Sequence, residues 1–191
     1  MAYPFGIANI RRRDMIDLDE AGIELSTADR KIGKAFVGKR VRQSGLYSRT
    51  DKWTILLAIA GDEDGSRWLD YWTGEGTDGD RMVKFVRHIL VDIGLGTNDR
   101  RRTFTMDNLS SHHGLQMATI IHNAGHRLAF RAPYYPVDGP IEYVFNTIQC
   151  ALRINNHLIS DGQSLIDEMR NAIANIETFV PYFIHCGFHL N

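Results

Sequence analysis

The apolar residues of this chain change their spacing near residue 80, and this change is the strongest constraint on the fold. Before it, residues 53–60 form a nearly continuous apolar run of strand length, and residues 67–72 supply a partner strand across an acidic turn. After it, apolar residues recur at helical spacing over 82–93. Paired strands followed by alternating strands and helices predict an α/β fold, in which helices cover a mixed sheet.

The remaining elements follow from similar patterns. Further strands are expected at residues 15–18, 36–41, 103–107 and 127–131, although Gly38 weakens the second of them. Helices are expected after Ser110 or Ser111, from Pro140, and over about 163–178 as the last element. The chain has no internal repeat and no linker, and 191 residues suit a single core, so we expect one domain over 1–191.

Composition limits the class of protein. No apolar stretch approaches the ~20 residues that span a bilayer, and no secretory signal is apparent, so no membrane partner is expected. Two cysteines favour a reducing compartment over a disulfide framework. A net charge of −1 argues against a strongly basic nucleic-acid module. The cations are nevertheless clustered, at 11–13, 31–42 and 100–102, although such clusters are usually solvated surface.

Acidic residues at three places carry the functional argument. Asp107 ends the strand expected at 103–107, and Glu142 stands third in the helix that begins at Pro140. A further acid comes from Asp17 or Asp19, which share one strand face because side chains alternate. Each position also has an ordinary interpretation: a turn for Asp107, a favourable helix-dipole position for Glu142, and solvent exposure for the early acids.

Acids that converge from strands and a helix start predict a bound divalent metal. Two like charges ~4 Å apart repel each other by about 4 kcal/mol at an effective dielectric of ~20, so such a cluster is hard to explain without a cation. Mg²⁺ prefers hard oxygen ligands. Two metal ions roughly 3.5–4 Å apart stabilise the attacking and leaving oxygens of a phosphodiester displacement. The acids therefore predict metal-dependent phosphate chemistry.

The acids also lie in motifs that resemble a known family. Asp19-Glu20-Ala21-Gly22, Asp107-Asn108 with His112 five residues after the aspartate, and the segment 133–145 with Pro140-Ile141-Glu142 are similar to the catalytic domain of mariner-type DDE transposases. This superfamily spans bacterial insertion sequences and eukaryotic mobile elements. The second and third acids are 142 − 107 = 35 positions apart, a spacing typical of it. The resemblance covers nearly the whole chain, including residues 180–187.

The resemblance implies an RNase H-like fold, a mixed five-stranded sheet flanked by helices. It implies that Asp19, Asp107 and Glu142 are catalytic and bind two Mg²⁺ (or Mn²⁺) ions. Asp19 is preferred to Asp17 because the family's first acid directly precedes a glutamate. Asn108 and His112 would act around the ligands or contact DNA. The basic residues expected to contact phosphates are Lys31, Lys34, Lys39, Arg40, Arg42, Arg100, Arg101 and Arg102.

The implied activity is cleavage of double-stranded DNA at transposon ends and strand transfer into target DNA. The protein would be intracellular (nuclear in a eukaryote, in the cytoplasm or nucleoid of a bacterium) and could be a homodimer. Two departures from the family pattern stand out. Gly139 replaces the usual Asn, which removes a helix cap worth a few tenths of a kcal/mol. Only about 14 residues precede the first strand, so the N-terminal helix-turn-helix DNA-binding region is expected to be absent.

Two alternatives to an active transposase domain remain. One is a catalytically inactive or domesticated remnant that keeps the fold and acts as a DNA-binding or scaffold protein. The other is a plain RNase H-like nuclease that cleaves RNA–DNA hybrids. Metal binding distinguishes the remnant, and a comparison of hybrid with duplex DNA as substrate distinguishes the nuclease.

Overall fold

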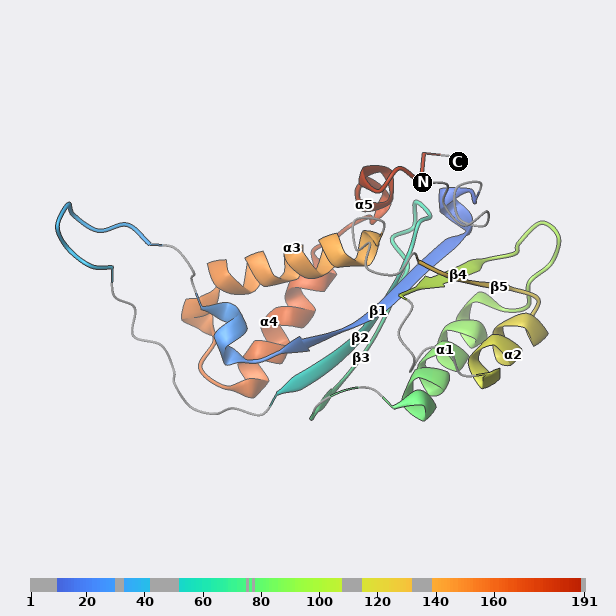
Figure 1. The fold of residues 1–191 in the computed structure, drawn as a ribbon, viewed down its shortest axis with the longest axis horizontal. Helices are drawn as coiled ribbons and strands as arrows, with labels where there is room; N and C mark the ends of the chain where they lie inside the picture. Colours follow the sequence, from blue (N-terminus) through green and yellow to red (C-terminus); the bar gives the residue numbers. More distant parts are fainter. Residues whose placement is uncertain are drawn as a thin grey trace.

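A computed structural model describes residues 10–29, 33–41, 52–74, 76, 78–107, 115–131 and 139–189. At its centre is one five-stranded sheet with the strand order β3-β2-β1-β4-β5 (Figure 1). The strands are β1 (Met15–Ile23), β2 (Trp53–Ala60), β3 (Arg67–Thr73), β4 (Thr103–Met106) and β5 (Arg127–Phe130). β1 pairs antiparallel with β2 and parallel with β4, which confirms the prediction of a mixed sheet.

β1 is the central strand, and it extends beyond the expected residues 15–18. Its last residues include Glu20 and Gly22, which have low strand propensity. They nevertheless pair with Leu56 and Thr54 of β2, whose own sequence is strongly strand-forming. Pairing with β2 therefore carries β1 past Leu18, and Asp19 lies inside the strand instead of at its end.

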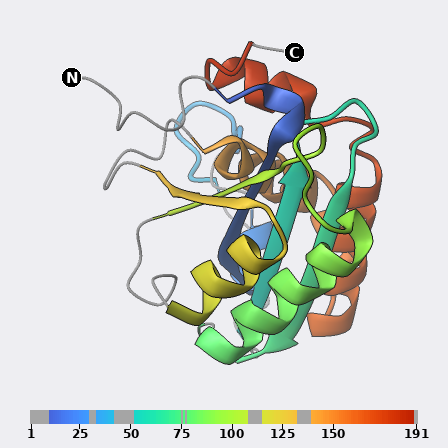
Figure 2. The same cartoon turned by 90° about the vertical axis from the view of Figure 1, so that its right-hand side faces the viewer.

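Helices cover both faces of the sheet (Figures 1 and 2). On one face, α1 (Gly79–Ile93) and α2 (Leu115–Asn123) pack on a core that includes Ile16 and Leu18 of β1. On the other face, α3 (Pro140–Ile154), α4 (Gly162–Ala174) and α5 (Val180–His185) pack on a core that includes Met15 and Ile23. The odd-numbered side chains of β1 thus point toward α3. Asp17 and Asp19 belong to this set.

The helix boundaries follow the start and stop signals in the sequence. Asp78 caps α1 by accepting a hydrogen bond from the backbone N–H of Arg81, and Gly94 ends it with a φ of 74°. Pro140 occupies the first turn of α3, as predicted. Three short 3₁₀ helices complete the described elements: η1 (Arg12–Asp14), η2 (Leu25–Ala28) and η5 (Asn156–Leu158).

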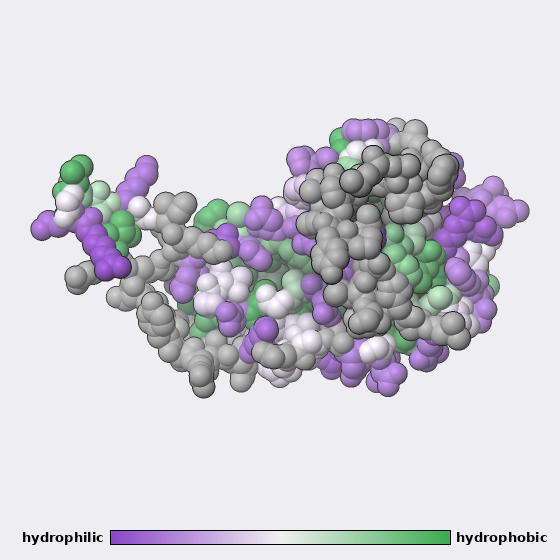
Figure 3. Space-filling model, viewed as in Figure 1, coloured by the Kyte–Doolittle hydropathy of each residue, from purple (hydrophilic) through white to green (hydrophobic). Residues whose placement is uncertain are grey.

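The strand expected at 36–41 is wrong. Residues 33–41 stand apart from the sheet and helices, and all of their side chains are exposed, with Phe36 89% exposed (Figures 1 and 3). The backbone N–H of Lys39 donates to the carbonyl of Phe36 at 2.9 Å, and Gly38 adopts a φ of 80°. This turn interrupts the extended conformation that the apolar residues suggest.

The expected last helix at 163–178 is also wrong in its extent. α4 ends at Ala174, and the separate helix α5 follows. The guanidinium of Arg67 on β3 donates to the carbonyl of Ile173, which satisfies one of the terminal acceptors of α4. Pro181 then stands in the first turn of α5, where its missing N–H is tolerated. Among the described helices, none has the length and apolar character to cross a membrane.

Candidate active site

Asp17 is fully buried at the centre of the site and is held by three donors. The hydroxyl of Thr105 on β4 donates to its Oδ1 at 2.8 Å, and the backbone N–H of Ile141 in α3 donates to its Oδ2 at 3.0 Å. Arg131 Nη1 lies 3.1 Å from the same Oδ2. These partners all donate, as an ionised carboxylate requires. Asp17 therefore links β1 to β4, to the first turn of α3 and to the residue after β5.

Arg131 carries a second ion pair, to Asp19. Its Nη2 lies 2.7 Å from Asp19 Oδ2, so the two terminal nitrogens of one guanidinium hold two different carboxylates. Asp19 Oδ1 accepts from the backbone N–H of Glu20 at 2.7 Å. Arg131 and Asp19 are both 6% exposed. The charges are thus paired inside the protein, with Asp19 the more accessible of the two aspartates.

Burial dominates the electrostatics of these groups. Desolvation raises the pKa of Asp17, although the nearby Arg131 guanidinium and the hydrogen bond from Ile141 oppose it. Desolvation also raises the pKa of Asp19, to about 7, although Arg131 and the hydrogen bond from the backbone N–H of Glu20 oppose it. The aspartates in turn raise the pKa of Arg131 against the effect of its own desolvation. Burial therefore disfavours the charged form of both aspartates, and the guanidinium of Arg131 offsets part of that cost.

Asp107 is the first residue after β4, and it adds a further negative charge to the site. β1 and β4 pair in parallel with Asp17 opposite Thr105, and Asp19 and Asp107 each come two residues later in the same direction. The charge of Asp107 raises the pKa of both aspartates of β1. Asp107 therefore lies near enough to Asp17 and Asp19 for its charge to affect both.

Glu142 reaches the site from the first turn of α3. It is exposed, and its charge raises the pKa of Arg131. Gly139, the residue before this helix, has no side chain to cap it. A Cβ atom at Gly139 would lie 2.2 Å from Arg131 Nη1 and 3.3 Å from Glu142 Cγ. The guanidinium thus lies close to the start of α3, near both Gly139 and Glu142.

The acids match a divalent metal in chemistry, although their side chains do not close around one point. Carboxylate oxygens are the hard ligands that Mg²⁺ and Mn²⁺ prefer. Within the described residues, no three His, Cys, Asp or Glu side chains form a group that could hold one metal ion. The cation found among these acids is the Arg131 guanidinium, which already occupies one oxygen of Asp19. The donor set therefore fits a metal, with Arg131 as a competing cation.

Comparison with known proteins identifies the family. The model of the DDE superfamily endonucleases matches residues 14–166, which is well over half of the chain. This chain belongs to the DDE superfamily endonuclease family. No curated protein matches it significantly in sequence.

Solved structures show that this DDE endonuclease has the RNase H-like fold of the Mos1 transposase catalytic domain. The Mos1 strand transfer complex matches with a TM-score of 0.70 and 17% identity, over 92% of this chain and 51% of that chain. The catalytic domain of Mos1 mariner transposase matches with a TM-score of 0.63 and 13% identity, over 92% and 76%. The Mos1 paired end complex with Mn matches with a TM-score of 0.69 and 17% identity, over 91% and 52%. This chain therefore spans about half the length of the full transposase chains it matches.

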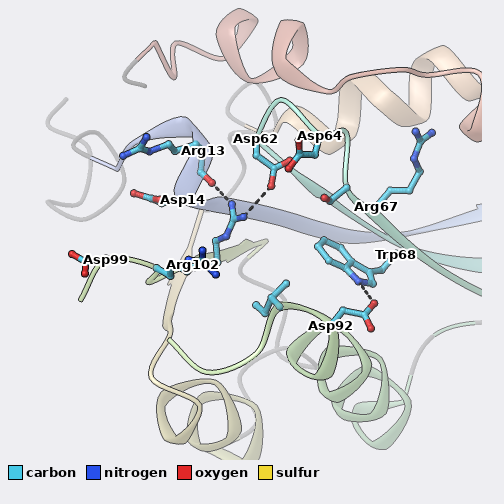
Figure 4. Close-up of a pocket in the computed structure, with 12 residues that line it drawn as sticks. Arg13, Asp14, Asp62, Asp64, Arg67, Trp68, Asp92, Asp99 and Arg102 are labelled. Atoms are coloured by element: carbon cyan, nitrogen blue, oxygen red, sulfur yellow. Dashed lines mark hydrogen bonds and ion pairs between the residues drawn. The ribbon is translucent and has the colours of Figure 1, made fainter. Parts of the chain in front are cut away.

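The basic residues expected to contact DNA lie in two separate regions of the DDE endonuclease. Lys34, Lys39 and Arg40 are exposed on the projecting segment 33–41. Arg100 and Arg102 precede β4 and line a pocket of about 720 Å³ (Figure 4). Arg101, between them, is exposed. Lys31, Arg42, Asn108 and His112 lie outside the described residues.

The pocket beside Arg102 is mixed in charge, not basic. Arg102 Nη2 lies 3.0 Å from Asp62 Oδ2, and its Nη1 donates to the carbonyl of Arg13 (Figure 4). Trp68 Nε1 donates to Asp92 Oδ2 at 2.8 Å on another wall. The aspartates that line this pocket are Asp14, Asp62, Asp64, Asp92 and Asp99. Contact of these arginines with phosphates stays a prediction, because Arg102 is already engaged with the protein.

Arg131 is the functional residue that the sequence analysis missed. It follows β5 directly, just as Asp107 follows β4, and β4 and β5 are parallel neighbours. Residues that follow adjacent parallel strands meet at one edge of a sheet, so this position was a sequence-level signal. Its partners Asp17 and Asp19 are 114 and 112 positions away, which no local pattern reveals.

Proposed function

We propose that this chain is the catalytic domain of a DDE transposase, which cuts DNA strands and joins the cut ends to target DNA. Asp19, Asp107 and Glu142 would hold divalent metal, with Mg²⁺ or Mn²⁺ as the ion and two ions per site. Asp17 would hold the site together without binding metal. The fold and the family match support the transposase assignment.

The observation that carries this proposal is that acids from three elements act on one another through their charges. Asp107, which follows β4, raises the pKa of Asp19 on β1, and Glu142 in the first turn of α3 raises the pKa of Arg131, the ion-pair partner of Asp19. Asp17 is poorly suited to bind metal, because it is fully buried and three donors already hold its oxygens. The side chain of Asp19 lies on the same face of β1 as that of Asp17 but is more exposed, which supports Asp19 as the first metal-binding acid.

The reaction needs in-line displacement at phosphorus. Water would attack the scissile phosphate and break its bond to the 3′ oxygen, which leaves as a 3′-hydroxyl, with the phosphate retained on the 5′ end. That hydroxyl would then attack a phosphate of the target strand, form a new phosphodiester bond and displace the target's 3′ oxygen as a hydroxyl. Bound metal ions supply activation of the nucleophile and stabilisation of the leaving oxygen. The protein supplies orientation: Thr105, Ile141 and Arg131 fix Asp17, and Arg131 fixes Asp19.

We propose double-stranded DNA as the substrate and a homodimer as the working form. Several matched structures are complexes of Mos1 transposase, among them a paired-end complex with left transposon end. Lys34, Lys39 and Arg40 are exposed and lie away from the sheet, so they suit contacts to a phosphate backbone. Such contacts would make binding strongly dependent on salt.

A plasmid-nicking assay tests the proposed activity. The purified chain is incubated with supercoiled DNA and Mn²⁺ or Mg²⁺, and nicked product is measured over time. Asp107→Asn and Glu142→Gln should each lower the nicking rate by at least a hundredfold while leaving the melting temperature within a few degrees. Asp80→Asn is the matched control, because Asp80 is an exposed acid in the first turn of α1. Equal nicking by wild type and Asp107→Asn refutes the assignment.

The second candidate is an inactive remnant that keeps the fold. The observation that favours it is the Arg131 guanidinium, which holds Asp19 and is itself affected by the charge of Glu142. Ligand binding to the native state raises stability by RT ln(1 + [L]/Kd), so an intact metal site raises the melting temperature with added Mn²⁺. A remnant shows no rise, and Asp107→Asn changes nothing in it.

A further inference from the structure

The guanidinium of Arg131 lies beside Asp17 and Asp19, where a metal ion would be expected in a metal-binding cluster of acids. Its guanidinium is 6% exposed and contacts two carboxylates at once. Both contacts are charge-assisted hydrogen bonds, which are stronger than neutral ones. The two pairs differ in their surroundings. Asp17 accepts hydrogen bonds from Thr105 and Ile141 in addition to its pair with Arg131. For the Oδ2 atom of Asp19, the donor is Arg131.

The start of α3 is shaped to admit this guanidinium. A Cβ atom at Gly139 would lie 2.2 Å from Arg131 Nη1 and 3.0 Å from its Cζ, so any other residue would collide with the side chain. The backbone of Gly139 has a φ of −95°, which any residue adopts, so conformation does not require glycine here. The close approach of the Arg131 guanidinium is what requires glycine at this position.

We propose that Arg131 is a built-in cation of the acidic site, which holds Asp19 in the absence of metal and sets the affinity for divalent metal by competing for Asp19 Oδ2. This inference rests on the proposed metal-dependent function. Metal loading exchanges the Arg131–Asp19 pair for a metal–Asp19 contact, while the Arg131–Asp17 pair keeps β1 joined to β5. Arg131 acts through Asp19, and it is a positioning residue.

The physical reason is the repulsion between like charges at short range. A divalent ion on Asp19 would lie within a few ångströms of the guanidinium, where Coulomb repulsion in a poorly hydrated site is strong. A carboxylate oxygen that already accepts a charge-assisted hydrogen bond is also a weaker metal ligand. Removing the cation should therefore tighten metal binding, provided that Asp17 is not left as a buried unpaired charge.

Calorimetric titration with Mn²⁺ alone tests this proposal in matched variants. Asp17→Asn combined with Arg131→Met should bind Mn²⁺ at least tenfold more tightly than Asp17→Asn alone, because the two proteins differ only in the cation. Arg131→Lys keeps the charge and should stay within about threefold of wild type. Arg127→Met is the control on the same strand, since Arg127 is exposed at the start of β5, and it should leave affinity unchanged.

Two results would overturn the proposal. One is equal or weaker Mn²⁺ binding by the double variant than by Asp17→Asn, including no binding by either. The other is an increase in Mn²⁺ affinity in Arg131→Lys as large as the increase in the methionine variant, because the loss of positive charge would then not be the cause of the tighter binding. The proposed function is judged separately, from loss of Mn²⁺ binding and nicking in Asp107→Asn. That loss can hold while Arg131 variants change nothing, so the two failures are distinguishable.

Discussion

Replacing Arg131 with methionine removes the guanidinium but leaves the fully buried Asp17 carboxylate in place. Breaking a buried pair by deleting one partner costs about 3–5 kcal/mol. Protonation of Asp17 sets a similar bound. Protonating a carboxylate with an ordinary pKa of about 3.9 at pH 7 costs about 4 kcal/mol, at about 1.4 kcal/mol per pH unit between the pKa and the solution pH. We expect Arg131→Met to lose about 4 kcal/mol of unfolding free energy at pH 7.

The pH dependence of this loss separates a charge effect from a packing effect. At pH 5 the same proton costs only about 1.5 kcal/mol, so the penalty of Arg131→Met should shrink by more than half. Asp17→Asn added to Arg131→Met removes the unpaired charge and keeps a carbonyl oxygen for Thr105 and Ile141. This double variant should recover at least half of the lost stability at pH 7 and show little pH dependence.

Urea unfolding followed by tryptophan fluorescence measures these differences, because Trp53, Trp68 and Trp72 all lie in β2 and β3. Arg127→Met serves as the control for removing an exposed cation from β5. A loss below about 1 kcal/mol at pH 7 would show that Asp17 does not need its counter-ion. Equal losses at pH 5 and pH 7 would show that the methionine disturbs packing instead.

Three further predictions concern the same site. Gly139→Asn should cost about 1–3 kcal/mol of unfolding free energy in the wild type, because the added Cβ meets the guanidinium of Arg131. The same substitution should cost nothing in the Asp17→Asn/Arg131→Met background, which lacks the guanidinium. A double-mutant cycle measured by urea unfolding would contradict this if the two effects were additive. Thr105→Val should lose about 1 kcal/mol through the hydrogen bond to Asp17, and a neutral result in urea unfolding would deny that bond any role in stability. The pKa of Asp19 is about 7 in the folded state and about 3.8 in the unfolded state, so the folded protein binds this proton more tightly. The stability that comes from this proton is fully present below pH ~4 and is lost as the pH rises to ~7. Urea midpoints in EDTA between pH 5 and pH 8 should therefore fall with pH in the wild type and fall less in Asp19→Asn, and identical slopes would show that Asp19 does not titrate in this range.

Local patterns predicted most of the elements because they depend on contiguous residues. The run at 53–60 is β2, and the helical spacing after residue 80 is α1, with Gly94 as its stop. Proline fixed the start of α3. In each of these places the apolar pattern, the cap and the turn residue agree, which is the condition under which a sequence specifies its own local structure.

Long-range pairing explains where the patterns failed. β1 continues through Glu20 and Gly22 because β2 pairs with them, although their own propensities oppose a strand. Residues 36–41 have strand-like apolar residues but remain exposed around the turn at Gly38. The period of a sequence gives the face that a strand would present, but only a neighbouring strand supplies the hydrogen bonds that make it one.

The acids were predictable and their counter-ion was not, for a related reason. Asp107 and Glu142 stand at a strand end and a helix start, and these positions are visible in the sequence. Arg131 stands at an equivalent strand end, yet its significance depends on Asp17, which is 114 positions away. A carboxylate is expected at a phosphate-cleaving site from chemistry alone, whereas an arginine acquires its role only from the partners that the fold brings to it.

Gly139 shows how a tertiary contact overrides a local rule. By helix-capping energetics, glycine in place of asparagine costs a few tenths of a kcal/mol, so the sequence alone suggests a slightly weakened helix start. In the structure, the missing side chain admits Arg131 Nη1, and leaving the buried Asp17 without this partner would cost several times more than the lost cap. The ion pair therefore decides which residue stands at this position. Gly139 and Arg131 therefore form one unit, and substitutions at either position should have effects that depend on the other.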